Sequence, residues 1–196
     1  MKNWKPQHYL LLSLAVICID QLVKYIVHQN MYYQEEIPFL GFIKWNYQLN
    51  AGMAWGTSLE FLGDYKKITL TLFRLIVSFL IPVYLIKLYN KKSHPGLILC
   101  IALIFGGALG NLIDGLFYGV LDPENLQVYN KWDMGLFHGY VIDMIYFDLY
   151  HGKLPLVGRV DLWPVFNVAD SAIFCSVIAI MIFNKKFFPE EEQNAE

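Results

Sequence analysis

The sequence predicts an all-α integral membrane protein with four transmembrane helices, both termini cytoplasmic, and a small extracytoplasmic β-rich element. Of its 196 residues 56% are hydrophobic and only 16% are charged, and the mean hydropathy is +0.39. Soluble domains carry about a quarter charged residues, so a chain this apolar fits a lipid environment. Its length fits one membrane domain over residues 1–196. The net charge of -2 gives no indication of nucleic-acid binding.

Four apolar segments are long enough to cross about 30 Å of hydrocarbon at about 1.5 Å per residue. The first segment follows Lys2 and Lys5, as the apolar part of a secretory signal would. It carries Asp20 and Lys24, however, and no small-residue cleavage site follows, so we interpret it as a retained helix. The predicted spans cover about residues 9–27, 68–89, 96–117 and 167–183.

Basic residues around these spans predict the orientation. If both termini are cytoplasmic, seven basic residues next to the spans lie on the cytoplasmic side, as the positive-inside rule favours. Segments 28–67 and 118–166 then lie outside. The basic residues concerned are Lys2, Lys5, Lys87, Lys91, Lys92, Lys185 and Lys186.

The first outer segment contains a strand pattern. Apolar side chains at positions 43, 45, 47 and 49 alternate with polar ones at 44, 46, 48 and 50. Gly52 and Gly56 follow and mark turns or close approach. We therefore expect a small sheet that lies on the outer ends of the helices.

All four spans place polar residues near their outer ends. Ionisable side chains near hydrocarbon cost a few kcal/mol each at mid-bilayer, so a shared wet cavity explains them better than chance. In the third span, Ala102, Gly106, Gly110 and Asp114 recur every four residues, which directs Asp114 into the bundle. The polar layer comprises Asp20, Gln21, Lys24, Thr69, Thr71, Arg74, Asn111, Asp114, Asn167 and Asp170.

Each polar residue also has a purely structural explanation. Asn167 is a good N-cap, with Asp170 placed to favour the helix dipole. Asp20 and Lys24 form an i,i+4 pair that could neutralise itself, and Asp143 could be an interfacial turn residue. Taken singly these explanations are favoured, but taken together they are not.

The chemistry open to such a layer is that of carboxylates. The chain has no HExxH, no histidine in an apolar span and no serine in GxSxG. Two neighbouring carboxylates share one proton, so that one activates water while the other donates a hydrogen bond to a scissile carbonyl. This aspartic-protease chemistry needs neither a metal nor a cofactor. Composition alone leaves open which two aspartates pair.

Five sequence blocks resemble those of the lipoprotein signal peptidases, also called type II signal peptidases. They occur in the family's order and extend over almost the whole chain. The blocks are DQLVK (20–24), NAGMAWG (50–56), GGALGNLID (106–114), VIDMI (141–145) and FNVADSAI (166–173).

This resemblance implies a membrane aspartic endopeptidase of the bacterial cytoplasmic membrane. Its partners would be membrane lipids and diacylglyceryl-modified prolipoproteins, cut before the lipidated cysteine at the outer face. The residues leave the oligomeric state open, and a monomer is expected. By position, Asp143 and Asp170 match the catalytic dyad. The matching supporting residues are Asp20, Lys24, Asn50, Gly52, Asn111, Asp114, Asn167 and Ala169.

Two departures from the family pattern concern the surroundings of the dyad. The family usually has arginine after the aspartate of the GNLID block, where this chain has Gly115. Arg74, which could also snorkel toward the interface, is a candidate to supply that charge. The segment 115–140 is longer than usual, which suggests an insertion or a lid.

Two other classes of function stay open on the residues. A small transporter or proton carrier could use the same carboxylates, although such proteins more often hold them near the midplane, with broken helices or repeated halves. A non-enzymatic lipoprotein-assembly factor would need the fold but not the two aspartates.

Overall fold

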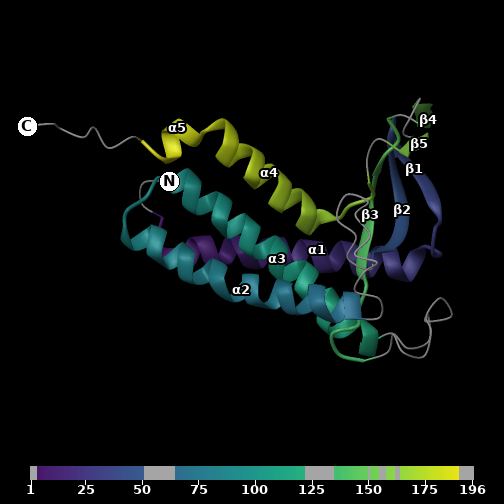
Figure 1. The fold of residues 1–196 in the computed structure, drawn as a ribbon, viewed down its shortest axis with the longest axis horizontal. Helices are drawn as coiled ribbons and strands as arrows, with labels where there is room; N and C mark the ends of the chain where they lie inside the picture. The colour runs from purple at the N-terminus through teal and green to yellow at the C-terminus, as the bar shows by residue number, and fades with distance from the viewer. Residues whose placement is uncertain are drawn as a thin grey trace, which may run out of the picture.

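The structure, a computed structural model, describes residues 4–50, 65–121, 135–149, 151–154, 158–161 and 164–189. It has a bundle of apolar helices with a small sheet across one end (Figure 1). Gly52, most of the 50–56 block and residues 122–134 of the longer 115–140 segment lie outside the described residues.

The helices occupy the positions that the apolar segments predict. They are α1 (Pro6–Asn30), α2 (Lys66–Asn90), α3 (Pro95–Leu121), α4 (Val168–Ile182) and the short α5 (Asn184–Phe187). Within the described ranges, α1, α2 and α3 are long and apolar enough to cross a membrane. α4 is apolar but has only 15 residues, about 22 Å of helix. The count of four spans therefore stays a prediction.

The predicted strand is confirmed, and it is the central strand of a three-stranded antiparallel sheet. β2 (Ile43–Asn50) pairs with β1 (Glu36–Leu40) on one side and with β3 (Val141–Phe147) on the other. The β2–β3 register places Gln48 opposite Asp143. A separate hairpin consists of β4 (His151–Leu154) and β5 (Gly158–Asp161).

The sheet is anchored on the end of α1. Val27 packs with Tyr47 of β2 and with Ile142 and Met144 of β3 in one buried cluster. The ring of His28 adds a 2.5 Å hydrogen bond between its Nδ1 and the Tyr47 hydroxyl. Figure 1 shows the sheet at one end of the bundle and the α2–α3 connection, with α5, at the other. β3 is therefore held at the sheet end of the bundle, in contact with α1 and α3.

The central helix of the bundle is α3, which contacts α1, α2 and α4. Its small residues permit these contacts, as the four-residue spacing predicts. A Cβ placed on Gly106 would lie 2.7 Å from the Ser13 carbonyl oxygen of α1, and one on Gly107 would lie 2.5 Å from the Ala169 carbonyl oxygen of α4. The Ser13 hydroxyl also donates to the Ala102 carbonyl at 2.7 Å. Close backbone approach thus fixes α1 and α4 on two sides of α3.

Enlarging Gly107 should separate α4 from α3. We expect Gly107→Val to lower the free energy of unfolding by about 1–3 kcal/mol, because its Cβ would meet main chain rather than a movable side chain. Thermal unfolding in detergent measures this. Val120→Leu, on the exposed side of the same helix, is the matched enlargement and should leave the unfolding temperature unchanged. Equal unfolding temperatures for the two variants would contradict the packing described.

Candidate active site

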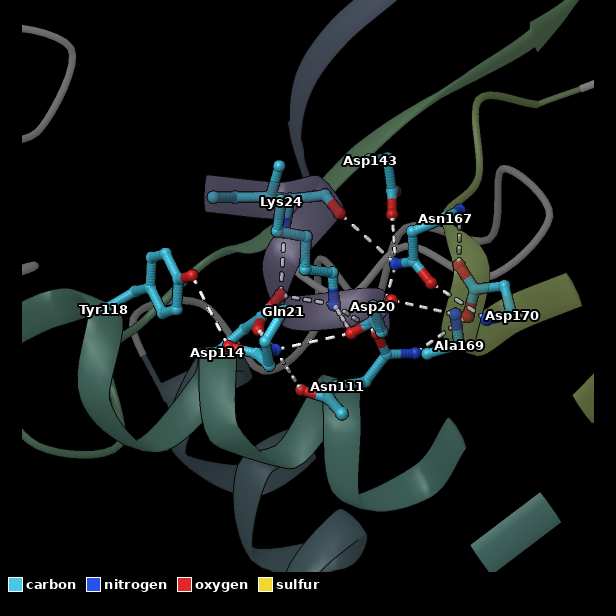
Figure 2. A network of polar contacts seen from close by, with 12 residues as sticks. Asp20, Gln21, Lys24, Asn111, Asp114, Tyr118, Asp143, Asn167, Ala169 and Asp170 are labelled. Atoms are coloured by element: carbon cyan, nitrogen blue, oxygen red, sulfur yellow. Dashed lines mark hydrogen bonds and ion pairs between the residues drawn. The ribbon is translucent and has the colours of Figure 1, made fainter. Parts of the chain in front are cut away.

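Most of the predicted polar layer meets at the sheet end of the bundle (Figure 2), but Thr69 of α2 is exposed. Asp20, Lys24 and Asp114 are 0% exposed, and Asp143 on β3 is 2% exposed. Burial of this many charges in so small a volume requires that each be paired or hydrogen-bonded. The contacts below show how this requirement is met.

Lys24 lies at the centre of the buried charges. Its Nζ is 2.8 Å from Asp20 Oδ2, 2.7 Å from Asp114 Oδ2 and 3.0 Å from Asn111 Oδ1. The three ammonium protons thus have three acceptors. The predicted i,i+4 pair of Asp20 and Lys24 is present. It does not account for all contacts of the ammonium, which also binds α3.

Asp20 and Asp114 each hold the main chain next to another aspartate. Asp20 Oδ1 accepts a 2.8 Å hydrogen bond from the main-chain N–H of Ala169, and Asp114 Oδ2 accepts one of 3.1 Å from that of Ile142. Ala169 precedes Asp170, and Ile142 precedes Asp143. The Lys24 cluster, defined as Asp20, Lys24 and Asp114, therefore positions α4 and β3 through backbone groups.

Asn167 joins the two remaining aspartates. Its Nδ2 donates to Asp143 Oδ1 at 2.7 Å, to Asn111 Oδ1 at 3.1 Å and to the Ile142 carbonyl at 3.3 Å. Its Oδ1 accepts from the Asp170 N–H at 2.8 Å, and its own N–H donates to Asp170 Oδ2 at 3.4 Å. Figure 2 shows Asn167 between Asp143 and Asp170. The predicted cap is thus confirmed as a capping box, and the same residue also holds Asp143.

The main chain also ties β3 to the start of α4. Phe166 donates its N–H to the Ile145 carbonyl at 3.0 Å and accepts the Ile145 N–H at 2.7 Å. This isolated antiparallel bridge lies two residues from Asp143 on one strand and one residue from Asn167 on the other. The spacing of Asp143 and Asp170 is therefore set by backbone pairing as well as by side chains.

Asp143 is a strand residue, so the turn explanation for it is wrong. Its Oδ2 accepts a 2.9 Å hydrogen bond from Asn50 Nδ2 on the neighbouring strand β2. Burial raises the pKa of Asp143 to about 8, and the charge of Asp170 contributes to the increase. Asp170 Oδ1 accepts from Asn111 Nδ2 at 2.8 Å. Each of the two carboxylates thus receives a side-chain amide from a supporting asparagine in addition to its contact with Asn167.

Two residues of the network are absent from the predicted site. Gln21 Nε2 donates to Asp114 Oδ1 at 2.8 Å and to the Gly110 carbonyl at 3.1 Å, and the Tyr118 hydroxyl donates to Gln21 Oε1 at 3.5 Å. The signals were available, because Gln21 is adjacent to Asp20 and Tyr118 is one helical turn after Asp114. Gln21 thus completes the hydrogen bonding of Asp114, and Tyr118 in turn bonds Gln21.

The family model for signal peptidase II matches residues 12–185 of the chain. The chain belongs to this family. It is 37% identical to a lipoprotein signal peptidase of Amoebophilus asiaticus, over 94% of this chain and 79% of the relative. A lipoprotein signal peptidase of Porphyromonas gingivalis is 31% identical, over 90% of this chain and 83% of the relative. The resemblance carried by the five sequence blocks is thereby confirmed.

A similar fold occurs in a solved structure. A bacterial membrane enzyme determined by the in meso method at 2.3 Å resolution superposes with a TM-score of 0.63 at 24% identity, over 98% of this chain and 97% of that one. Together with the three long apolar helices, family membership makes this chain a multi-pass membrane protease.

Removing the central ammonium should destabilise the whole network. We expect Lys24→Met to cost about 3–5 kcal/mol of unfolding free energy, because Asp20 and Asp114 would stay buried without their cation. Thermal or denaturant unfolding in detergent measures the loss. The triple variant Lys24→Met, Asp20→Asn, Asp114→Asn removes both orphaned charges and should recover part of it. No difference between the single and triple variants would contradict the role given to the ion pairs.

Proposed function

We propose that this protein removes signal peptides from diacylglyceryl-modified prolipoproteins, cutting before the lipidated cysteine with Asp143 and Asp170 as an aspartic dyad. Its relatives are named lipoprotein signal peptidases. The observation that carries the dyad is the position of Asn167, whose side chain donates to Asp143 at 2.7 Å and whose main chain donates to Asp170 at 3.4 Å. Two carboxylates on different elements are thereby held around one residue.

The dyad holds a single proton at neutral pH. Two carboxyl groups held this closely do not both ionise at neutral pH, and the raised pKa of Asp143, about 8, supports this. The shared proton belongs to the pair, which titrates as a unit. One member is then a carboxylate able to accept a proton, and the other is an acid able to donate one.

Hydrolysis uses both members. The carboxylate takes a proton from a water molecule, and the oxygen of that water molecule bonds to the scissile carbonyl carbon. The acid gives its proton to the carbonyl oxygen. The tetrahedral intermediate then collapses and the amide C–N bond breaks. The leaving nitrogen takes the proton that the first aspartate gained from water, and a hydroxyl of the intermediate returns its proton to the second aspartate. The products are a signal peptide with a new carboxyl terminus and a lipoprotein whose lipidated cysteine has a free amine, and the pair again shares one proton.

The dyad lies at the outer face of the cytoplasmic membrane in this proposal, with four spans and both termini inside. Charge distribution supports this orientation. Lys87 and Lys91 line a cavity with Phe187 at the end of the bundle away from the sheet, and the positive-inside rule places that end in the cytoplasm. A lipid-anchored cysteine would meet the dyad where its acyl chains leave the bilayer.

The supporting residues act through position rather than chemistry. Asp20, Lys24 and Asp114 hold the main chain before each dyad member, and Asn111 and Asn50 each donate an amide to one carboxylate. The role of Gly52 stays a prediction from the family block. A monomer suffices, because both aspartates come from one chain.

Replacing either dyad member should abolish cleavage. We expect Asp143→Asn and Asp170→Asn each to lower kcat by about 10²–10⁴-fold, because a neutral amide neither accepts the proton of water nor donates one of its own. The measurement is cleavage of a diacylglyceryl-modified prolipoprotein by purified protein in detergent.

Asp148→Asn is the matched control for this experiment. Asp148 pairs with Lys44 at the far end of β3, outside the network, so activity should be retained. Cleavage by both folded dyad variants would refute the dyad and leave Asp170 as a helix cap. A folded wild type that cuts none of several lipidated substrates would favour the assembly-factor function.

The pH dependence of cleavage follows from the shared proton. As pH rises through about 8 the pair loses that proton, the acid is no longer available, and kcat/KM should fall by about tenfold per pH unit. A pH series of initial rates between pH 6 and about 10 measures this. A rate that stays constant to the alkaline end would show that the reaction does not need the shared proton.

A further inference from the structure

Arg74 is a cation of α2 that takes no part in the hydrogen-bonded network formed by the described residues. α2 is apolar on its outer side, where Phe73, Ile76 and Phe79 are all more than half exposed. Its other side carries polar residues at spacings of four, three and four, which place them on one helical face. This polar face comprises Lys67, Thr71, Arg74 and Ser78, and it includes the buried Thr71 and Ser78.

The guanidinium of Arg74 lies within the electric field of the site. It interacts electrostatically with Asp170 most strongly, then with Asp114 and Asp143. These carboxylates come from α4, α3 and β3, so the charge faces the point where the three elements meet. The side chain is half-buried, which makes a charge on it costly unless it is compensated.

The close approach of α2 to α3 sets the position of Arg74 along the bundle. A Cβ on Gly115 would lie 2.9 Å from Thr71 Oγ1, so a larger residue there would displace Thr71, whose hydroxyl donates to the Phe137 carbonyl. Arg74 is three residues beyond Thr71, about 4.5 Å along α2, and Asn111 is four residues before Gly115, about 6 Å along α3. Since consecutive helices α2 and α3 run in opposite directions, Arg74 reaches about the level of Asn111. Asn111 bonds Asp170.

No hydrogen bond or ion pair to the Arg74 guanidinium occurs among the residues that the structure describes. The group has five N–H donors and stays charged at any relevant pH. Its three carboxylate neighbours attract it from beyond ion-pair distance. A half-buried guanidinium in this state has N–H donors available to an acceptor from outside the described residues. The surrounding aspartates disfavour an anion in this place, so a neutral carbonyl oxygen is the acceptor that fits.

We propose that Arg74 is a substrate-positioning residue that donates hydrogen bonds to a main-chain carbonyl of the lipid-modified peptide, on the α2 side of Asp170. The proposal rests on the proposed function and adds a contact to it. Gly115 contributes to this position of Arg74. Because it has no side chain, α2 can approach α3 closely enough to bring Arg74 to the dyad.

A second consequence distinguishes this role from packing. The charges that face the dyad are Arg74 of α2, Lys24 and Asp20 of α1, and Asp114 of α3. Removing the positive charge of Arg74 makes proton loss from the dyad less favourable. The alkaline decline in kcat/KM should therefore move to higher pH when Arg74 is neutral and stay in place when it is lysine.

The test compares Arg74→Gln and Arg74→Lys with wild type. We expect Arg74→Gln to raise KM at least about tenfold, as loss of a hydrogen bond to a charged donor implies, and to move the alkaline limb up by at least about 0.5 pH unit. Arg74→Lys should leave the alkaline decline in kcat/KM at its wild-type pH and should raise KM less than Arg74→Gln does. Lys87→Gln, which removes a cation from the other end of α2, should change neither.

Binding separates failure of this proposal from failure of the proposed function. In an Asp143→Asn background, the affinity for a diacylglyceryl-modified signal peptide is measured without cleavage, and adding Arg74→Gln should weaken it at least about tenfold. Unchanged affinity in that folded variant, or equal losses for glutamine and lysine with no pH shift, would overturn the role of Arg74. A wild type that binds the peptide but does not cut it would instead overturn the proposed function. The role of Arg74 would then be tested by the binding affinities alone.

Discussion

The buried ammonium of Lys24 is the interaction on which the rest of the site depends. One cation holds two carboxylates from α1 and α3, and each carboxylate in turn binds a main-chain N–H, one on α4 and one on β3. Buried ion pairs are stable only when their remaining hydrogen bonds are made. Here Gln21 and the two N–H groups complete that set. The same bonds that satisfy the charges therefore determine where Asp143 and Asp170 lie.

Packing in the bundle follows from the lack of a hydrophobic driving force between helices in lipid. Association there depends on close contact between small residues and on polar contacts. Gly106 and Gly107 provide the first on two sides of α3, and the bond from Ser13 to the Ala102 carbonyl provides the second. The packing of the bundle and the polar site thus both depend on α3. Its glycines let the neighbouring helices, which carry site residues, approach closely.

Much of this arrangement could be predicted from the sequence, and the failures have physical reasons. Apolar length predicts the helices, and alternation of side chains predicts β2. The strand β3 escapes this signal because its residues are buried on both faces, so Asp143 resembles a turn residue. The composition leaves the pairing of aspartates open because the two lie on different elements, and only the sequence blocks indicated it. Gln21 was predicted in the polar layer without a site role, and its contact with Tyr118, 97 positions away, leaves no local pattern.

The bridge between Ile145 and Phe166 has a consequence for how such a chain can diverge. β3 is placed by three attachments: its pairing with β2, the bridge itself, and the bond from Ile142 to Asp114. None of them depends on how many residues join α3 to β3. Lengthening a connection costs little conformational entropy, about 0.6 kcal/mol per doubling. The connection between α3 and β3 can therefore lengthen or shorten while the spacing between the two aspartates is kept.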